Sequence, residues 1–350
     1  MIDDCLARLN DVVDPEHVLR SEERMLAATR YQPVDRLPRV VHCPVDGWPA
    51  FTYREGFEDP AKMLLNELAS VWVGAQVRDD RAYTIRANYG VGGIASMLGC
   101  EVKLTDDNTM PWLFPLEDGE LDRILDAGEV DIEAGLGARV FETERFYIDA
   151  LSRHEALART VHVYVSDTQG PFDTAHLVMG HKIYTEIYDN PARVHRLLEL
   201  VTDAYIRFTR AQREIIGEFG DTSYHSTLRI RGAVRICDDS GINLSTDFYR
   251  EFCKPYNQRI LAEFGGGWVH YCGGGQQILQ EVLSTEGITG INFGNPERQD
   301  ISLICKEAAS RETAVLGWPT AFSVPEWVTT GMTLVESAAD LEAGRAIAAG

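Results

Sequence analysis

Segments patterned as β-strands alternate with segments patterned as helices along most of this chain. The strand segments are short and rich in β-branched and apolar residues, whereas the helix segments repeat apolar residues every three to four positions. Alternation of this kind predicts an α/β fold with a parallel sheet, and eight strand segments predict a (β/α)8 TIM barrel. The strands are expected within residues 39–43, 79–88, 160–167, 233–237, 267–272, 287–294, 313–318 and 332–336.

One domain can account for all 350 residues, because α/β barrels commonly exceed two hundred residues as a single unit. No internal repeat or flexible linker divides the sequence. We therefore expect a single barrel domain over residues 1–350, with an N-terminal helical arm over about 1–36 that two prolines terminate. Residues of about 89–150 are expected to form an irregular, acidic excursion that caps the barrel.

The charge balance argues against nucleic acid as a partner. The chain has 33 basic and 54 acidic residues, a formal net charge of −21 that repels phosphate backbones. No apolar run approaches the roughly 18 residues of a membrane span, and the N-terminus lacks a secretory pattern. We expect a cytoplasmic protein with no membrane partner. Its seven cysteines are then expected to be reduced thiols. A cysteine with a functional role would be a metal ligand or a reactive thiol.

The glycine-flanked strand within residues 265–275 is the strongest candidate for a site. Alternate side chains of a strand share a face, so His270 and Cys272 point the same way. Three glycines follow at 273–275 and leave room for a ligand. An imidazole and a thiolate are ligands that select Zn²⁺. The alternative is that both residues are merely buried, and the position at a strand end favours the metal interpretation.

A catalytic zinc ion uses three protein ligands, so a third must be found. Cys237 ends a neighbouring strand and is the best chemical match. Asp238, Asp239 and Glu336 are oxygen alternatives. Asp238 and Asp239 could equally form a solvated turn or a helix cap.

Other polar residues also follow strands, at the end of a barrel where loops converge on one mouth. We expect Asp239 and His225 to have catalytic roles. The residues expected to bind the substrate are Asp167, Gln169, Asn292 and Trp318.

Four segments that together span most of the chain carry a family pattern: Glu23-Arg-Met-Leu-Ala-Ala-Thr-Arg-Tyr-Gln-Pro-Val-Asp-Arg-Leu-Pro38, Gly170-Pro-Phe172, Asp238-Asp-Ser-Gly-Ile-Asn-Leu-Ser245 with Phe248 to Tyr256, and His270-Tyr-Cys-Gly273. In these segments the chain resembles the uroporphyrinogen decarboxylase superfamily. The His-x-Cys pair is similar to that of its zinc-dependent, cobalamin-linked methyltransferase branch. The resemblance implies a uroporphyrinogen decarboxylase-like barrel, zinc at His270 and Cys272, and a corrinoid (methylcobalamin) on a partner protein.

Two departures from the family pattern shape the functional hypothesis. The first strand reads Val40-Val-His-Cys-Pro-Val-Asp46 and lacks the arginines that hold substrate carboxylates in the decarboxylases. The methyltransferases place a third cysteine ligand near the last strand, where this chain has Leu334-Val-Glu-Ser337. The zinc shell is therefore either rebuilt or incomplete.

The leading hypothesis is a zinc-dependent methyltransferase that moves a methyl group between a corrinoid protein and a small thiol or methylated substrate. Its small-molecule methyl donor or acceptor, the direction of transfer and the oligomeric state stay open, with a homodimer among the alternatives. The rival hypotheses are a decarboxylase-like lyase and a non-catalytic barrel that binds a tetrapyrrole or another small ligand.

Overall fold

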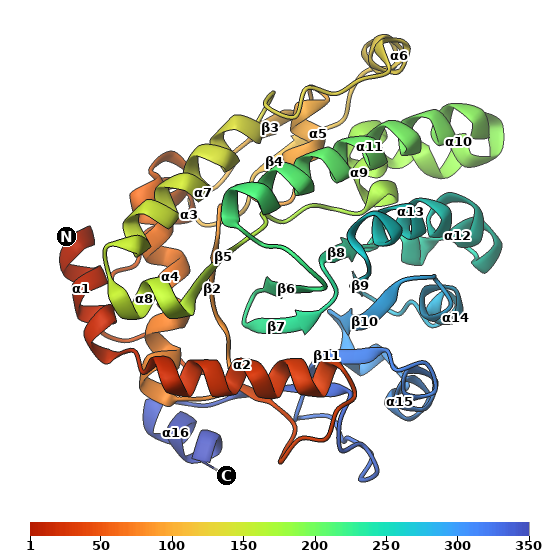
Figure 1. The fold of residues 1–350 in the computed structure, drawn as a ribbon. Coiled ribbons are helices and arrows are strands. Elements are labelled where there is room, and N and C mark those ends of the chain that lie inside the picture. The colour runs from red at the N-terminus through yellow and green to blue at the C-terminus, as the bar shows by residue number, and fades with distance from the viewer. Residues whose placement is uncertain (350) are drawn as a thin grey trace.

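The structure, a computed structural model that describes residues 1–349, contains two parallel sheets surrounded by helices (Figure 1). Each of the eight strand segments expected from the sequence overlaps one of their strands. The larger sheet has six strands and the smaller has two. The order in the larger sheet is β1 (Arg39–His42), β12 (Met332–Ser337), β11 (Ala314–Pro319), β10 (Ile288–Phe293), β9 (Gly267–Tyr271) and β8 (Val234–Cys237), and the smaller pairs β2 (Tyr83–Arg86) with β5 (Val161–Tyr164).

At each of the two junctions between the sheets, a backbone N–H next to one sheet donates to a backbone carbonyl oxygen of the other. The Asp80 N–H donates to the Arg39 carbonyl oxygen at 3.0 Å, and the Gly170 N–H donates to the Cys237 carbonyl oxygen at 2.9 Å. Within residues 1–349, strand pairing joins neither β1 to β2 nor β5 to β8. The molecule is thus a mixed α/β structure built around a six-stranded parallel sheet, and closure of all eight strands into one barrel stays a prediction.

Helices cover the outside of the sheets (Figure 1). No helix within residues 1–349 has both the length and the apolar character needed to cross a membrane. Several begin at clear sequence signals, such as Asp14, whose carboxylate caps α2 ahead of a proline. The helices are α1 (Ile2–Val12), α2 (Pro15–Thr29), α3 (Tyr53–Glu58), α4 (Pro60–Val77), α5 (Gly93–Met97), α6 (Asp118–Ala127), α7 (Gly137–Ser152), α8 (Glu155–Thr160), α9 (Pro171–Met179), α10 (Ile183–Asp189), α11 (Pro191–Ile216), α12 (Thr246–Phe252), α13 (Lys254–Phe264), α14 (Leu279–Leu283), α15 (Ile301–Ala309) and α16 (Leu341–Ala349), with short 3-10 turns η1 (Gly180–Lys182), η2 (Gly241–Asn243) and η3 (Pro296–Arg298).

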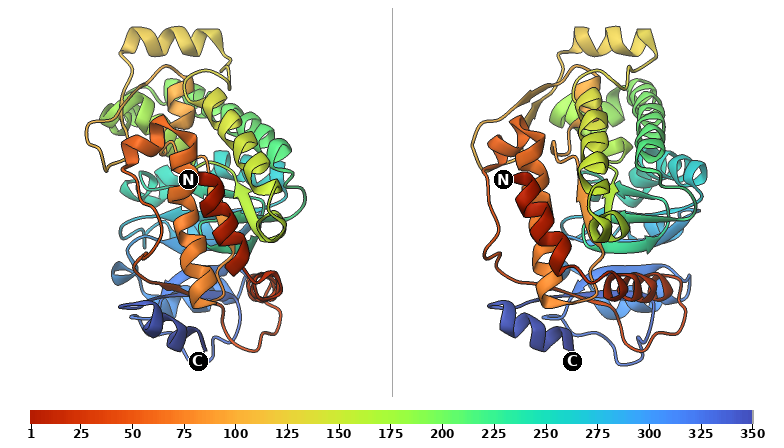
Figure 2. Two further views of the ribbon diagram at one scale, coloured as in Figure 1. Left: turned by 90° about the vertical axis from the view of Figure 1, so that its left-hand side faces the viewer. Right: turned by 60° about the vertical axis from the view of Figure 1, so that its left-hand side comes forward.

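The excursion over residues 89–150 is regular rather than irregular, which corrects the expectation from the sequence. It contains α5, an antiparallel hairpin of β3 (Glu101–Lys103) and β4 (Trp112–Phe114), α6 and most of α7. Figure 2 shows α6 at the end of the molecule opposite the C-terminus. The hairpin was missed because its strands are only three residues long and mostly exposed, so they carry little apolar periodicity.

A second antiparallel hairpin, β6 (Thr222–His225) with β7 (Leu228–Arg231), lies between the two sheets (Figure 1). Leu228 and Ile230 are buried in one apolar cluster with Trp268 of β9. The cluster also contains Met25, Val40, Ala314 and Leu316, from α2 and the strands of the larger sheet. The hairpin therefore fills the space that the strands surround. It also brings His225, the last residue of β6, toward the middle of the molecule.

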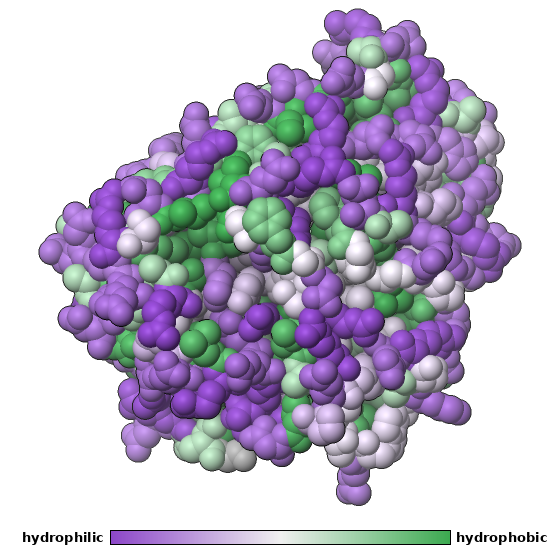
Figure 3. All heavy atoms as spheres, viewed as in Figure 1, coloured by the Kyte–Doolittle hydropathy of each residue, from purple (hydrophilic) through white to green (hydrophobic). Residues whose placement is uncertain are grey.

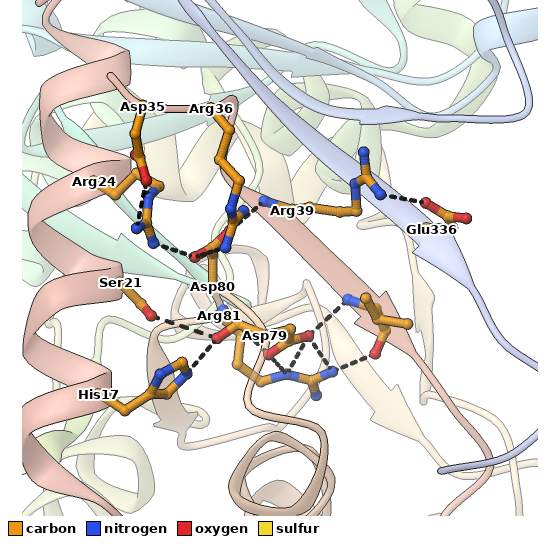
Figure 4. Close-up of polar contacts among 11 residues, drawn as sticks. His17, Ser21, Arg24, Asp35, Arg36, Arg39, Asp79, Asp80, Arg81 and Glu336 are labelled. Carbon is orange, nitrogen blue, oxygen red and sulfur yellow. Dashed lines mark hydrogen bonds and ion pairs between the residues drawn. The ribbon is translucent and has the colours of Figure 1, made fainter. Parts of the chain in front are cut away.

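Two buried aspartates attach the N-terminal arm to the sheets (Figure 4). The Asp80 carboxylate accepts hydrogen bonds from Arg24 at 2.7 Å, from the Arg39 N–H at 2.9 Å and from Arg36. The Asp79 carboxylate binds the Arg81 guanidinium. The backbone carbonyl oxygen of Asp79 lies 2.9 Å from Nε2 of His17 in α2. These contacts fix α2 across the junction between β1 and β2.

A cavity of about 310 Å³ with a mixed polar and apolar lining opens beside β5. In the space-filling view hydrophobic residues gather over this region, where Figure 1 places α7 and β5 (Figure 3). The lining of this β5 cavity includes Ile148, Leu151, Val161, Ile216 and the acidic Glu218.

Candidate metal centre and its surroundings

Strand register brings two rows of functional side chains together. Cys237 of β8 pairs with His270 of β9, and His270 pairs with Asn292 of β10. Two positions earlier, Arg235 pairs with Trp268. Because alternate residues share a face, Cys237, His270 and Asn292 form an upper row, while Arg235 and Trp268 lie in a lower row on the same side.

The upper row forms a cluster of potential metal ligands. One ligand atom each from Cys237, Asp239 and His270 lies within 4.8 Å of the others. The Cys272 sulfur lies 3.4 Å from His270 Nε2, and the Cys272 N–H donates to Asp239 Oδ1 at 2.6 Å. Sulfur, nitrogen and oxygen donors thus converge at one strand end, and this combination suits zinc.

Asn292 fixes the orientation of the His270 ring. Its side-chain nitrogen donates to the Leu316 carbonyl oxygen at 2.6 Å, so its oxygen faces His270 Nδ1, also at 2.6 Å. The hydrogen is then on Nδ1, and the Nε2 lone pair faces Asp239 and Cys272. Burial and the nearby Arg235 lower the pKa of His270, so the neutral, ligating form predominates near pH 7.

Asp173, which the sequence analysis did not single out, fixes the loop that carries Asp239. Its buried carboxylate accepts the N–H groups of Asp239 at 2.8 Å and Ser240 at 2.6 Å. Burial, with the charges of Asp238 and Asp239, raises the pKa of Asp173 well above its ordinary value. The available signal was its position in the Gly-Pro-Phe-Asp segment that follows β5.

Of the four residues proposed as a third ligand, two lie beside His270 and two do not. Cys237 and Asp239 belong to the cluster. Asp238 is fully buried and accepts hydrogen bonds from Tyr249 at 2.5 Å and Asn257 at 2.7 Å, so its position is that of a core residue. Glu336 of β12 pairs with Arg39 of β1 at 3.4 Å, near the edge of the larger sheet that is farther from β8 and β9.

The two thiols of the cluster hold their protons in the metal-free protein. Burial raises the pKa of Cys237 well above its ordinary value. Burial and the Asp239 carboxylate raise the pKa of Cys272 to about 11, although this residue is exposed overall. Gly294 leaves space for Cys272, since a side chain at 294 would place a Cβ 2.3 Å from the sulfur. A bound cation would therefore be needed to stabilise either thiolate at neutral pH.

A second polar cluster lies around Asp167. Its carboxylate pairs with Arg86, lies 3.3 Å from Arg235 and is 3.8 Å from His225 Nε2. Burial opposes ionisation of Asp167, but the two arginines outweigh it and lower the pKa below its ordinary value. Burial and Arg235 lower the pKa of His225 far enough to keep its imidazole neutral. We call this group the Asp167 cluster.

The remaining predicted site residues have other surroundings. Trp318 is buried and donates to the Phe322 carbonyl oxygen at 3.4 Å, as a core residue does. The Gln169 side-chain oxygen is buried and has no hydrogen-bond partner among residues 1–349. Sequence reasoning also missed Arg86 and Arg235. A charged residue inside an otherwise apolar strand, as in Val-Arg-Ile at 234–236, was the signal that could have identified them.

No protein-family model matched the sequence, and neither did any curated protein sequence. Among solved structures, a methyltransferase from Methanosarcina mazei is similar with a TM-score of 0.65 and 18% sequence identity. The match covers 94% of this chain and 97% of that chain. At this identity the similarity shows a shared fold, and it extends over nearly the whole of both molecules.

Proposed function

We propose that this protein is a zinc-dependent methyltransferase that moves a methyl group between a corrinoid on a partner protein and a small thiol or methylated substrate. The convergence of Cys237, Asp239 and His270 within 4.8 Å, with Cys272 beside them, carries the proposal. The fold shared with a protein described as a methyltransferase supports it. We further propose that the eight parallel strands form one barrel with this cluster at its mouth.

The donor set fits zinc better than a hard cation, because two of its four side chains are thiols. We assign Cys237, His270 and Cys272 as the ligands, which leaves a coordination position for the substrate. Zinc at this position would supply Lewis acidity that lowers the pKa of a substrate thiol. Asp239, whose carboxylate is 3.8 Å from His270 Nε2 and 38% exposed, would accept the thiol proton and pass it to solvent.

The other residues of the site position these groups. Asn292 holds His270 with Nε2 toward the cluster, and Asp173 holds the backbone from which Asp239 projects. Gly294 keeps the space beside the Cys272 sulfur free of a side chain. The chain itself thus binds and orients the small substrate, while the corrinoid would come from a separate protein.

Methyl transfer can be measured as the change in methylcobalamin absorbance when a thiol is added to the zinc-loaded protein. We expect turnover with wild-type protein and its loss in Cys272→Ser and His270→Ala. Cys305→Ser is the matched control, because Cys305 is a buried thiol in the apolar core away from the cluster. Inertness of the zinc-loaded protein toward a broad panel of thiols would contradict the thiol form of the proposal.

A further inference from the structure

We propose that the β5 cavity binds a small primary ammonium compound with an apolar body, whose charged group lies against Glu218. The cavity is then a second ligand site, separate from the metal cluster. The inference does not depend on the proposed methyl transfer, because none of the groups that carry it belongs to the metal cluster or to the Asp167 cluster.

The cavity lies at the other end of β5 from the metal cluster. Its lining includes Val161, the first residue of β5. The segment that follows the last residue of β5 reaches the metal cluster, where the Gly170 N–H donates to the Cys237 carbonyl oxygen at 2.9 Å. A ligand of the β5 cavity therefore does not occupy the position of a ligand bound to Cys237 and His270.

The size and the walls of the cavity suit a small molecule. Its volume of about 310 Å³ is at the lower end of the range for small-molecule sites, roughly 300–1,000 Å³. Ile148 and Leu151 of α7, Val161 and Val163 of β5, and Ile216 of α11 supply apolar walls. Figure 3 shows hydrophobic surface over this region. The occupant therefore needs an apolar body.

Glu218 supplies the acidic part of the lining and can accept further hydrogen bonds. One of its carboxylate oxygens accepts the Tyr224 N–H at 3.1 Å, and the other accepts from Arg213 at 3.0 Å. A carboxylate oxygen has two acceptor positions, so within residues 1–349 each oxygen keeps one position unused. An ammonium group offers three donors and the opposite charge, and it would favour the ionised form that burial disfavours.

A second buried carboxyl group lies behind Glu218. Glu144 is one turn before Ile148 on α7, and neither of its carboxyl oxygens has a hydrogen-bond partner within residues 1–349. Burial raises the pKa of Glu144 well above its ordinary value despite the exposed Arg145, and the charge of Glu218 adds to this effect. The ion pair of Glu218 with Arg213 supplies one positive charge for two carboxyl groups, so a monovalent cation would complete the balance.

The other polar groups of the lining are balanced without a ligand. His162 stacks on Tyr224 with ring centres 3.8 Å apart. Both contact the buried Glu22 carboxylate, His162 at 3.0 Å and the Tyr224 hydroxyl at 2.9 Å, and Arg229 lies 3.6 Å from it. The missing positive charge is therefore on the Glu218 side of the cavity, which is where the ammonium group would lie.

Three probes of one shape that differ in charge test the site: cyclohexylmethylammonium, cyclohexylmethanol and cyclohexanecarboxylate. Calorimetry on the full-length protein at about pH 8, where most of Glu218 is ionised, measures their affinities. We expect the ammonium compound to bind at least about tenfold more tightly than the alcohol, and the carboxylate to bind most weakly. Equal affinities for the ammonium compound and the alcohol, or no binding of the ammonium compound, would overturn the proposal.

A charge variant then identifies the carboxylate. Glu218→Gln should reduce the affinity for the ammonium compound to that for the alcohol, because the amide keeps the shape but not the charge. Glu214→Gln is the matched control, since Glu214 is exposed in the last turn of α11 and does not line the cavity. An ammonium preference that survives Glu218→Gln would show that another group binds the cation.

A blocking variant locates the apolar body. Ser152→Trp should abolish binding of all three probes, because Ser152 lines the cavity and is exposed at its edge, so a larger side chain can fill the space without entering the core. Arg153→Trp is the control, since Arg153 is exposed and lies outside the lining. Unchanged binding to Ser152→Trp, or an ammonium affinity that falls when a chelator removes zinc, would place the ligand elsewhere and overturn the assignment.

Discussion

Single hydrogen bonds decide which atoms of the cluster face one another. His270 offers Nε2 to Asp239 and Cys272 only because Asn292 occupies Nδ1, and Asn292 is itself fixed by the Leu316 carbonyl group. Partners of this kind tune metal affinity almost as strongly as the ligands do. The orientation of His270 is thus a property of the β9, β10 and β11 register rather than of the histidine alone.

Asn292→Ala should lower zinc affinity by about 10- to 100-fold, because the imidazole loses the acceptor that fixes its tautomer and ring orientation. Competition with a chromophoric zinc chelator measures the affinity. Asn190→Ala is the matched control, since Asn190 is exposed and, although it is the N-cap residue of α11, its side chain makes no capping hydrogen bond. Equal zinc affinities of wild type and Asn292→Ala would show that Asn292 has no such role.

Glu218 should make stability depend on pH. Burial raises its pKa to about 7, although Arg213 and the Tyr224 N–H both favour the carboxylate. A carboxyl group whose folded-state pKa is raised stabilises the protein below its unfolded pKa, and this contribution is lost as the pH rises through about 7. Between about pH 4.5 and pH 8, the free energy of unfolding of the wild-type protein should therefore fall by roughly 2–3 kcal/mol relative to that of Glu218→Gln.

Urea unfolding of wild type and Glu218→Gln across that pH range measures the difference. Glu214→Gln serves as the control because Glu214 is exposed in the last turn of α11, the helix that ends just before Glu218. Its stability should follow the wild-type curve. Parallel curves for wild type and Glu218→Gln would contradict the raised pKa of Glu218.

At the scale of elements, the arm and the central hairpin determine what the strands enclose. Hydrogen bonds from α2 to Asp79 and Asp80 hold this helix across the junction of β1 and β2. Leu228 and Ile230 of hairpin β6–β7 fill the interior. Neither arrangement comes from local preference alone. Both depend on contacts between residues far apart in the sequence.

Asp80→Asn should destabilise the protein by about 3 kcal/mol, because it leaves Arg24 and Arg36 without the buried charge that they share. Asp35→Asn is a stringent control: Asp35 binds the same Arg24 but is 65% exposed, so its loss should cost at most about 1 kcal/mol. Chemical denaturation gives both values. If the two variants lose similar amounts of unfolding free energy, burial of Asp80 does not strengthen its ion pairs with Arg24 and Arg36.

The elements that could be predicted from the sequence are those with a strong local pattern of apolar residues. Strands β8 to β12 were located because buried parallel strands are nearly continuous apolar runs. Hairpin β6–β7 was missed because its first strand, Thr222–His225, is polar and gains its burial from distant residues. In the site, His270 and Cys272 are two residues apart, so their proximity was expected from strand alternation, although Cys272 lies just after the end of β9. Arg86, Arg235 and Asp173 meet their partners only after the chain folds.

At the scale of the whole molecule, two rows of polar side chains lie one above the other at the carboxyl ends of β8 to β10. The upper row offers sulfur, nitrogen and oxygen ligands. In the lower row, Arg235 Nε and Trp268 Nε1 have no acceptor within residues 1–349. The upper row is the basis for the proposed function.

The central claim is that the cluster at the end of β8 and β9 binds zinc, and metal analysis of protein purified without chelator tests it most directly. The account predicts a single zinc ion per chain in wild-type protein. It also predicts loss of that ion in the double variant Cys237→Ser/His270→Ala, and its retention in the control Cys305→Ser. Metal-free wild-type protein that takes up no zinc on titration, or zinc that survives the double substitution, would contradict it.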